Sequence, residues 1–155
     1  GGQERGRRAG TENGPGIAGF GVAAEIASTH EYAMEINDLR DVLEARVTAN
    51  GGIIFGDGTA RIGNTSCISM PGVAAETQVI AFDLDGIAIS AGAACSSGKV
   101  GASHVLAAMG VAADEAETAI RVSLGHQTTA AHIDRFIGSW TTLRRRTGDR
   151  ARSAA

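Results

Sequence analysis

Five large apolar side chains near the end of the chain recur at the spacing of one helical face. They are Ile133, Phe136, Ile137, Trp140 and Leu143. Steps of three and four residues place all five on the same side of an α-helix, and such a stripe has to be buried against another apolar layer. Thr128 or Thr129 can cap the start of this helix. The rest of the chain must therefore supply a surface on which it packs.

Short strands upstream can form that surface. Apolar or alternating runs bounded by turn residues lie at 53–56, 65–70, 87–89 and 120–124. Helical spacing is found at 14–49, as one helix or two consecutive ones, and also at 74–84 and 104–109. This order predicts an α/β fold of the two-layer α+β kind, with helices packed on one face of a small sheet.

Composition excludes several classes of protein. The chain has 155 residues, of which 43% are hydrophobic and 20% charged, and this is typical of one soluble globular domain. A net charge of −3 gives no general reason to expect a nucleic-acid partner. No apolar run is long enough to span a membrane. Two cysteines do not make a disulfide framework, so we expect a reducing, cytoplasmic setting.

The distribution of glycine and of charged residues along the sequence divides the chain into three parts. Residues 1–13 are polar and rich in Gly and Arg, and they look like the middle of a longer protein rather than a natural start. Residues 14–147 form the predicted small domain, and 148–155 are predicted to be a disordered tail. The basic run Arg144-Arg145-Arg146 is interpreted as a favourable interaction with the dipole at the C-terminal end of the last helix.

Cys95 lies in a loop, predicted at 90–103, that is built from Gly, Ala and Ser. Such small residues pack weakly and leave the backbone free, so the thiol can move and react. Lys99 follows closely, and its charge can favour the thiolate. The loop does not match a phosphate-binding P-loop, a Cys–His hydrolase lacks its local signatures, and zinc-type spacing is weak. Cys67, inside a predicted strand, is expected to be a small buried hydrophobe.

Arg121 interrupts an otherwise apolar strand at 120–124. Its stem can lie along the sheet with its head group in water, or its guanidinium can hold a substrate carboxylate through two hydrogen bonds. A second candidate motif, Gly14-Pro15-Gly16-Ile17-Ala18-Gly19, matches G-x-G-x-x-G. The residues before it are polar rather than an apolar strand, so we interpret the match as chance.

Three segments carry a resemblance to a known family. GGQERGRRAGTEN, SAGAACSSGKVGASHVLAAMG and IRVSLGHQTT, in this order, resemble the C-terminal part of NifS/IscS-type cysteine desulfurases. These are pyridoxal-phosphate (PLP) enzymes of the class V aminotransferase family, with fold type I. The resemblance runs from Gly1 to about Arg145, and it implies that the chain is the small C-terminal domain with the segment joining it to the large domain.

The resemblance implies a sulfurtransferase that moves sulfur from L-cysteine to an enzyme cysteine, giving L-alanine and a persulfide for iron–sulfur cluster assembly. Cys95 matches the persulfide-forming nucleophile, and Arg121 matches the arginine that binds the substrate carboxylate. Thr11 matches the threonine that reaches the PLP phosphate of the neighbouring subunit in a homodimer. The implied partner is a sulfur acceptor or iron–sulfur scaffold protein. No intrinsic metal site is implied, although a Cys95 persulfide can contact a cluster.

One departure from the family is large. Its Schiff-base lysine lies upstream of the GGQERGRR segment, whereas the one lysine of this chain, Lys99, belongs to the cysteine loop. PLP normally needs that lysine. We therefore expect a C-terminal fragment that is inactive alone. Two alternatives stay open: a non-catalytic persulfide carrier or partner-binding module, and a fragment that folds only with a separately encoded N-terminal half.

Overall fold

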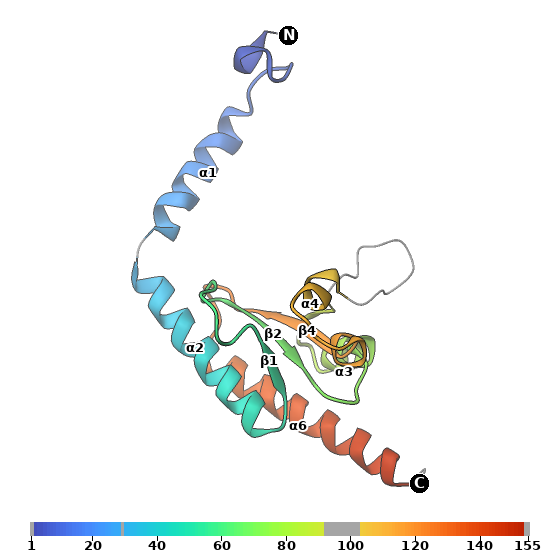
Figure 1. The fold of residues 1–155 in the computed structure, drawn as a ribbon. Helices are drawn as coiled ribbons and strands as arrows, with labels where there is room; N and C mark the ends of the chain where they lie inside the picture. Colours follow the sequence, from blue (N-terminus) through green and yellow to red (C-terminus); the bar gives the residue numbers. More distant parts are fainter. Residues whose placement is uncertain (1, 29, 92–102, 154–155) are drawn as a thin grey trace. The chain divides into compact units, whose positions relative to one another are not determined.

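The computed structural model describes residues 2–28, 30–91 and 103–153 of the chain. Its contacts divide into two units, Gly1–Ala33 and Met34–Ala155. Figure 1 shows the helices and strands and labels most of them. They are η1 (Gln3–Gly6), α1 (Gly14–Ala27), α2 (His30–Ala49), β1 (Ile53–Phe55), β2 (Thr65–Ser69), α3 (Ala75–Leu84), β3 (Ser90–Ala91), α4 (His104–Ala108), α5 (Ala113–Ala116), β4 (Ala119–Ser123) and α6 (Ala130–Ser153).

The first unit contains η1, α1 and the start of α2. Asn13 caps α1, since its side-chain oxygen accepts a hydrogen bond from the Gly16 amide at 3.1 Å, and Pro15 lies in the first turn. The G-x-G-x-x-G match thus lies across a helix start with no strand before it. No residue of α1 is buried. The contacts place a boundary between the units after Ala33, whereas the sequence divided the chain after Asn13.

The second unit is built on a four-stranded antiparallel sheet with the order β1-β2-β4-β3. Ile54 pairs with Ile68, and Ile68 pairs with Ile120, so these three side chains share one face. The edge strand β3 covers Ser90–Ala91 and not the predicted 87–89. This small antiparallel sheet with its helices confirms the predicted mixed α/β fold of the α+β kind.

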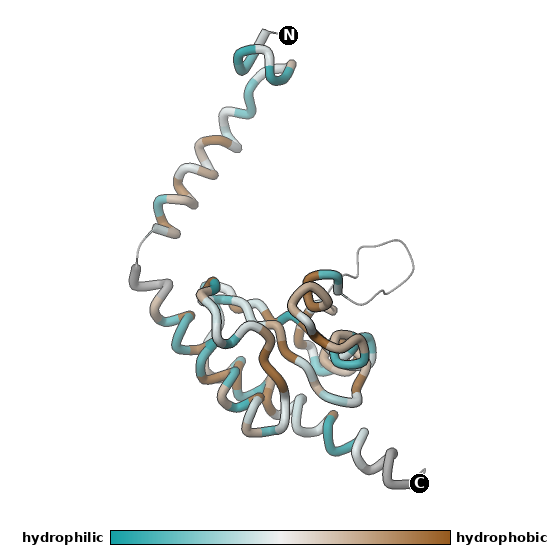
Figure 2. The backbone as a smooth tube through the Cα atoms, in the orientation of Figure 1, coloured by the Kyte–Doolittle hydropathy of each residue, from teal (hydrophilic) through white to brown (hydrophobic). Residues whose placement is uncertain are grey.

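Helices α2 and α6 cover the face of the sheet that carries Ile68 and Ile120 (Figure 1). The predicted stripe of α6 is buried, and Trp140 is fully enclosed. Phe136 stacks on Phe82 of α3 with ring centroids 4.7 Å apart. Figure 2 shows the apolar character of the strands as brown segments of the tube. Among the described residues, no helix has the length and apolar character needed to cross a membrane.

Helix α6 differs from its prediction at the C-terminal end. It begins at Ala130, directly after the predicted caps, but it continues to Ser153 rather than giving way to a tail at Gly148. Arg144, Arg145 and Arg146 therefore lie inside the helix and not in its last turn. The helix-dipole effect is confined to the last turn, so it does not account for these three arginines.

A partly buried ion pair joins α2 to the sheet. Arg61 donates two hydrogen bonds to the carboxylate of Glu44, at 2.6 and 2.7 Å, and the Ser66 hydroxyl donates a third at 2.5 Å. Burial disfavours the charged carboxylate, but these bonds and the charges of Arg61 and Arg40 outweigh it and hold the pKa of Glu44 below its usual value.

This network predicts a pH-dependent contribution to stability. Because the folded-state pKa of Glu44 is lowered, its contribution is present above the unfolded pKa and is lost as the pH falls through the folded value. Glu44→Gln should lower the free energy of unfolding at neutral pH by about 1–3 kcal/mol. The variant should also lose less stability than the parent between neutral pH and pH values below the usual glutamate pKa. Urea unfolding at several pH values measures both effects, with Glu35→Gln, which removes an exposed carboxylate from the same helix, as control.

Candidate functional site

The second face of the sheet carries a row of cross-strand neighbours that includes Arg121. Phe55 of β1 pairs with Cys67 of β2, Cys67 pairs with Arg121 of β4, and Arg121 pairs with Ser90 of β3. Residues directly opposite each other in antiparallel strands point to the same side of the sheet. The row therefore runs across all four strands on the side opposite the long helices.

Arg121 is the exposed member of this row. Its neighbours along β4, Ile120 and Val122, are buried on the helix-covered face, and strand alternation turns Arg121 to the other side. An arginine on an open sheet face keeps its guanidinium available to a ligand. Its planar fork of N–H donors suits a carboxylate.

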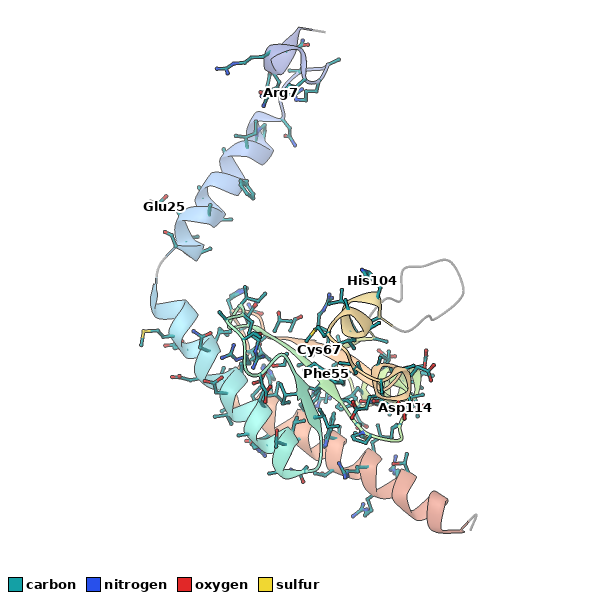
Figure 3. The ribbon with its side chains drawn as sticks, viewed as in Figure 1. Arg7, Glu25, Phe55, Cys67, His104 and Asp114 are labelled. Atoms are coloured by element: carbon teal, nitrogen blue, oxygen red, sulfur yellow. The ribbon has the colours of Figure 1, made fainter. Side chains whose placement is uncertain are left out.

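Two short helices cover part of the same face. Leu106 of α4 and Ala116 of α5 are buried with Ala119 of β4, and Phe55 and Cys67 pack against this cluster (Figure 3). The Ser103 side chain caps α4 by accepting a hydrogen bond from the Leu106 amide at 3.4 Å. The prediction of helices on one face is thus incomplete, because α4 and α5 lie on the other.

The residues on both sides of the 92–102 segment are described in the structure. The segment follows Ala91, the residue after the strand partner of Arg121, and it leads into α4, which packs beside Cys67. Cys95 and Lys99 themselves lie outside the described residues. The Cys95 segment thus follows a strand that pairs with β4, the strand of Arg121, and precedes a helix that packs on the Arg121 face.

Cys67 is close to Arg121, but its thiol is a poor nucleophile. Burial raises the pKa of the Cys67 thiol, and the positive charge of Arg121 opposes this only in part. At neutral pH the thiol stays protonated, and a protonated thiol is a poor nucleophile. Cys67 was expected to be a small buried hydrophobe, and in the structure it is partly buried and packs against the α4–α5 cluster.

We accordingly expect Cys67 to resist alkylation. In a Cys95→Ser variant, where Cys67 is the remaining thiol, iodoacetamide should react with the native protein about tenfold or more slowly than with the protein unfolded in guanidinium. Mass spectrometry of timed samples measures both rates. Equal rates in the native and unfolded protein would show that Cys67 is an accessible, reactive thiol.

The predicted phosphate ligand, Thr11, lies in the first unit, where its side chain is exposed. Arg8 orders the preceding turn by donating to the backbone carbonyls of Ala9 and Gly10, at 3.3 and 2.7 Å. Its guanidinium also lies 3.6 Å from Glu4 and 3.8 Å from Glu12. Because these carboxylates already face Arg8, an anion brought to this turn would have to compete with them.

Sequence reasoning singled out Cys95, Arg121 and Thr11 but missed the flanking row. Phe55 and Cys67 become neighbours of Arg121 only through the pairing register of three strands. Register depends on which face is buried and on turn geometry, so it could not be read from any one strand. One signal in the sequence could have pointed to this row. Cys67 lies in a short predicted strand, where side chains alternate between the two faces of the sheet.

Comparison with known proteins identifies the family to which this fold belongs. Residues 2–136 match the family model for aminotransferase class-V, and the chain belongs to this family.

Its relatives within the family are cysteine desulfurases. The chain is 46% identical over 137 residues to the cysteine desulfurase of Cereibacter sphaeroides, and 44% identical over 140 residues to cysteine desulfurase NifS of Azotobacter vinelandii. Both matches cover 87% of this chain and 35% of the relative. A solved NifS-like protein from Rickettsia africae has a TM-score of 0.80 at 36% identity, with coverage of 92% of this chain and 38% of that one. The chain thus spans about a third of the length of these relatives.

The described residues do not by themselves form a site that fits PLP. They include no lysine, and the chain's one lysine, Lys99, lies in the 92–102 segment. Thr11 is the one phosphate ligand that the resemblance assigns to this chain, and it belongs to a different unit from Arg121. No reaction step through PLP is therefore assigned to these residues.

Proposed function

We propose that this chain provides the sulfur-accepting and carboxylate-binding part of a cysteine desulfurase. The reaction consumes L-cysteine and the thiol of Cys95 and yields L-alanine and a Cys95 persulfide. The carbon–sulfur bond of the substrate breaks, a sulfur–sulfur bond forms on Cys95, and no external oxidant is needed. Family membership and 43–46% identity to cysteine desulfurases support this proposal.

The observation that carries the proposal is the pairing of Ser90 with Arg121. It attaches the start of the Cys95 segment to the strand that holds the candidate carboxylate ligand. A nucleophile must approach the substrate while another group fixes the substrate's orientation. Arg121 is suited to fix the α-carboxylate of cysteine, since its guanidinium is exposed on that face and permanently charged.

The rest of the PLP site is assigned to Thr11 and to residues of the large domain. PLP, when bound, supplies the electron sink for breaking the carbon–sulfur bond. We propose that Thr11 contacts the PLP phosphate of a neighbouring subunit in a homodimer, and that the Schiff-base lysine is not Lys99 but belongs to the large domain. The chain alone is then inactive.

The same proposal covers partners and location. A persulfide on Cys95 would be passed to a sulfur acceptor or an iron–sulfur scaffold protein, and the free thiols that this requires suit the cytoplasm. These assignments follow from the family resemblance and from the two cysteines of the chain.

A chimera tests the proposed activity. In it, this chain replaces the segment that it matches in the A. vinelandii cysteine desulfurase, which supplies the remaining two-thirds of the protein. The chimera should bind PLP and release alanine from L-cysteine, while the 155-residue chain alone should do neither. A folded, PLP-loaded chimera that forms no alanine would contradict the proposal. Sulfur uptake by Cys95 from a separate desulfurase, without alanine formation by the chimera, would favour the persulfide-carrier alternative instead.

A further inference from the structure

A basic segment at the end of α6 is not used by the proposed reaction. Residues 144–152 contain five of the chain's thirteen arginines and one acidic residue, although the whole chain has a net charge of −3. The helix continues to Ser153, so its dipole does not explain Arg144, Arg145 and Arg146, which lie before the last turn. None of these residues belongs to the Arg121 face.

Two of the arginines, Arg144 and Arg145, line a groove of about 840 Å³. Its walls are the end of α2 with the following turn (49–51), the turn after β2 (71–73) and one side of α6 (141–148). The volume is within the roughly 300–1,000 Å³ range of ligand-binding pockets. No Asp or Glu is among the described residues that line the groove, so its charge is wholly positive.

Arg144 is held in place at one end of this groove. Its guanidinium donates a hydrogen bond to the backbone carbonyl of Asn50 at 2.6 Å. It lies over Gly51, where a Cβ atom would collide with it and where the backbone has a φ of +71°. Only glycine readily combines that backbone conformation with that close approach. A guanidinium has five N–H donors, so the bond to Asn50 leaves others on the same fixed group for a ligand.

Arg145 adds a second charge, and the glycines of the groove add space. Arg145 is exposed on α6 beside Arg144. A Cβ atom built at Gly72 or at Gly148 would meet nothing within 4 Å. Open space next to two guanidinium groups allows the backbone of a ligand to come close while its acidic side chains reach the arginines.

We propose that this groove binds an acidic peptide segment of a partner protein, with its carboxylates on Arg144 and Arg145. Charge complementarity selects this occupant, because the described lining carries two guanidinium groups and no carboxylate. A nucleic acid fits less well, since the chain as a whole is negatively charged. The proposal does not depend on the desulfurase reaction.

Fluorescence anisotropy with labelled hexaglutamate tests the proposal on the 155-residue chain, with hexaglutamine as the neutral peptide. Hexaglutamate should bind and hexaglutamine should not. Arg145→Gln should weaken binding roughly fivefold or more, because it removes a charge-assisted contact. The matched control is Arg146→Gln, which removes the same charge from the next position of α6. Arg146 lines a different, smaller cavity, so this change should alter binding less than about twofold.

A steric variant separates shape from charge. Gly148→Leu keeps every arginine and places a side chain in the groove at a position where a Cβ atom is free of contacts. It should also weaken hexaglutamate binding roughly fivefold or more. Circular dichroism of each variant establishes that the helices are intact.

Three results would overturn the proposal. One is the absence of hexaglutamate binding by the folded chain. Another is equal weakening by Arg145→Gln and Arg146→Gln, which would indicate general attraction to a basic helix. The last is competition by citrate at the same carboxylate concentration as the peptide, which would make the groove a site for small anions.

Discussion

Cys95→Ser is expected to abolish alanine formation by the chimera. A serine hydroxyl cannot accept the substrate sulfur as a persulfide, so the carbon–sulfur bond has no nucleophile to complete its cleavage. PLP should still bind, because Cys95 is not proposed to hold it. Alanine measured by chromatography after addition of L-cysteine should fall to the level of the blank, while the PLP absorbance of the protein is unchanged.

The matched control for this prediction is Cys67→Ser. Cys67 is the other cysteine of the chain, it packs beside α4, and burial raises the pKa of its thiol. Cys67→Ser should keep most of the activity, apart from a modest loss of stability. If the Cys95→Ser chimera continued to form alanine while the Cys67→Ser chimera did not, the sulfur acceptor would be Cys67 and the assignment would be wrong.

Arg121→Ala should raise the KM of the chimera for L-cysteine roughly 10- to 100-fold. Hydrogen bonds to charged groups contribute about 1.5–3 kcal/mol, and about 1.4 kcal/mol corresponds to a factor of ten. The turnover number should change less than KM, because Arg121 is proposed to bind the carboxylate and not to take part in bond cleavage. Steady-state kinetics over a wide range of cysteine concentrations separates the two parameters.

A substrate without the carboxylate makes this prediction specific. The parent chimera should prefer L-cysteine to 2-aminoethanethiol, which lacks the carboxylate. Arg121→Ala should reduce that preference, because the variant can no longer bind the carboxylate of L-cysteine. Arg46→Ala, which removes an exposed arginine paired with Asp134, is the control and should leave the preference intact. An unchanged preference in Arg121→Ala would mean that the carboxylate is bound elsewhere.

The helical layer could be predicted from the sequence because its signal is local. The stripe of α6 from Ile133 to Leu143 depends on residues a few positions apart, and it is buried in the structure. The short β3 was misplaced by a few residues. Its two residues, Ser90 and Ala91, have little strand character of their own, and pairing with β4 determines where they lie.

The candidate site could be predicted only in part. Arg121 was found because a charged residue interrupts an apolar strand, and the family motif gave it a role. The row that surrounds it could not be found in this way, because Phe55 and Cys67 reach Arg121 through the register of distant strands. Helices α4 and α5, which cover part of that face, are also too short to give a clear amphipathic pattern.

The helix-dipole interpretation of the arginines at 144–146 depended on where the last helix ends. A break at Gly148 would have placed them in the last turn of the helix, but α6 continues to Ser153. Glycine inside a helix costs only about 1 kcal/mol relative to alanine, so the residues on both sides can carry the helix through it. Two of the three arginines instead line a groove shared with the turns after α2 and β2.

Mass spectrometry of the chimera after a brief exposure to L-cysteine tests the central claim most directly. Peptides that contain Cys95 and Cys67 are compared with and without a reducing agent, and alanine is measured in the same samples. The account predicts one additional sulfur atom on Cys95, removable by reduction, none on Cys67, and alanine formed in proportion to the persulfide. Alanine formation with no sulfur on Cys95, or with the sulfur on Cys67, would contradict it.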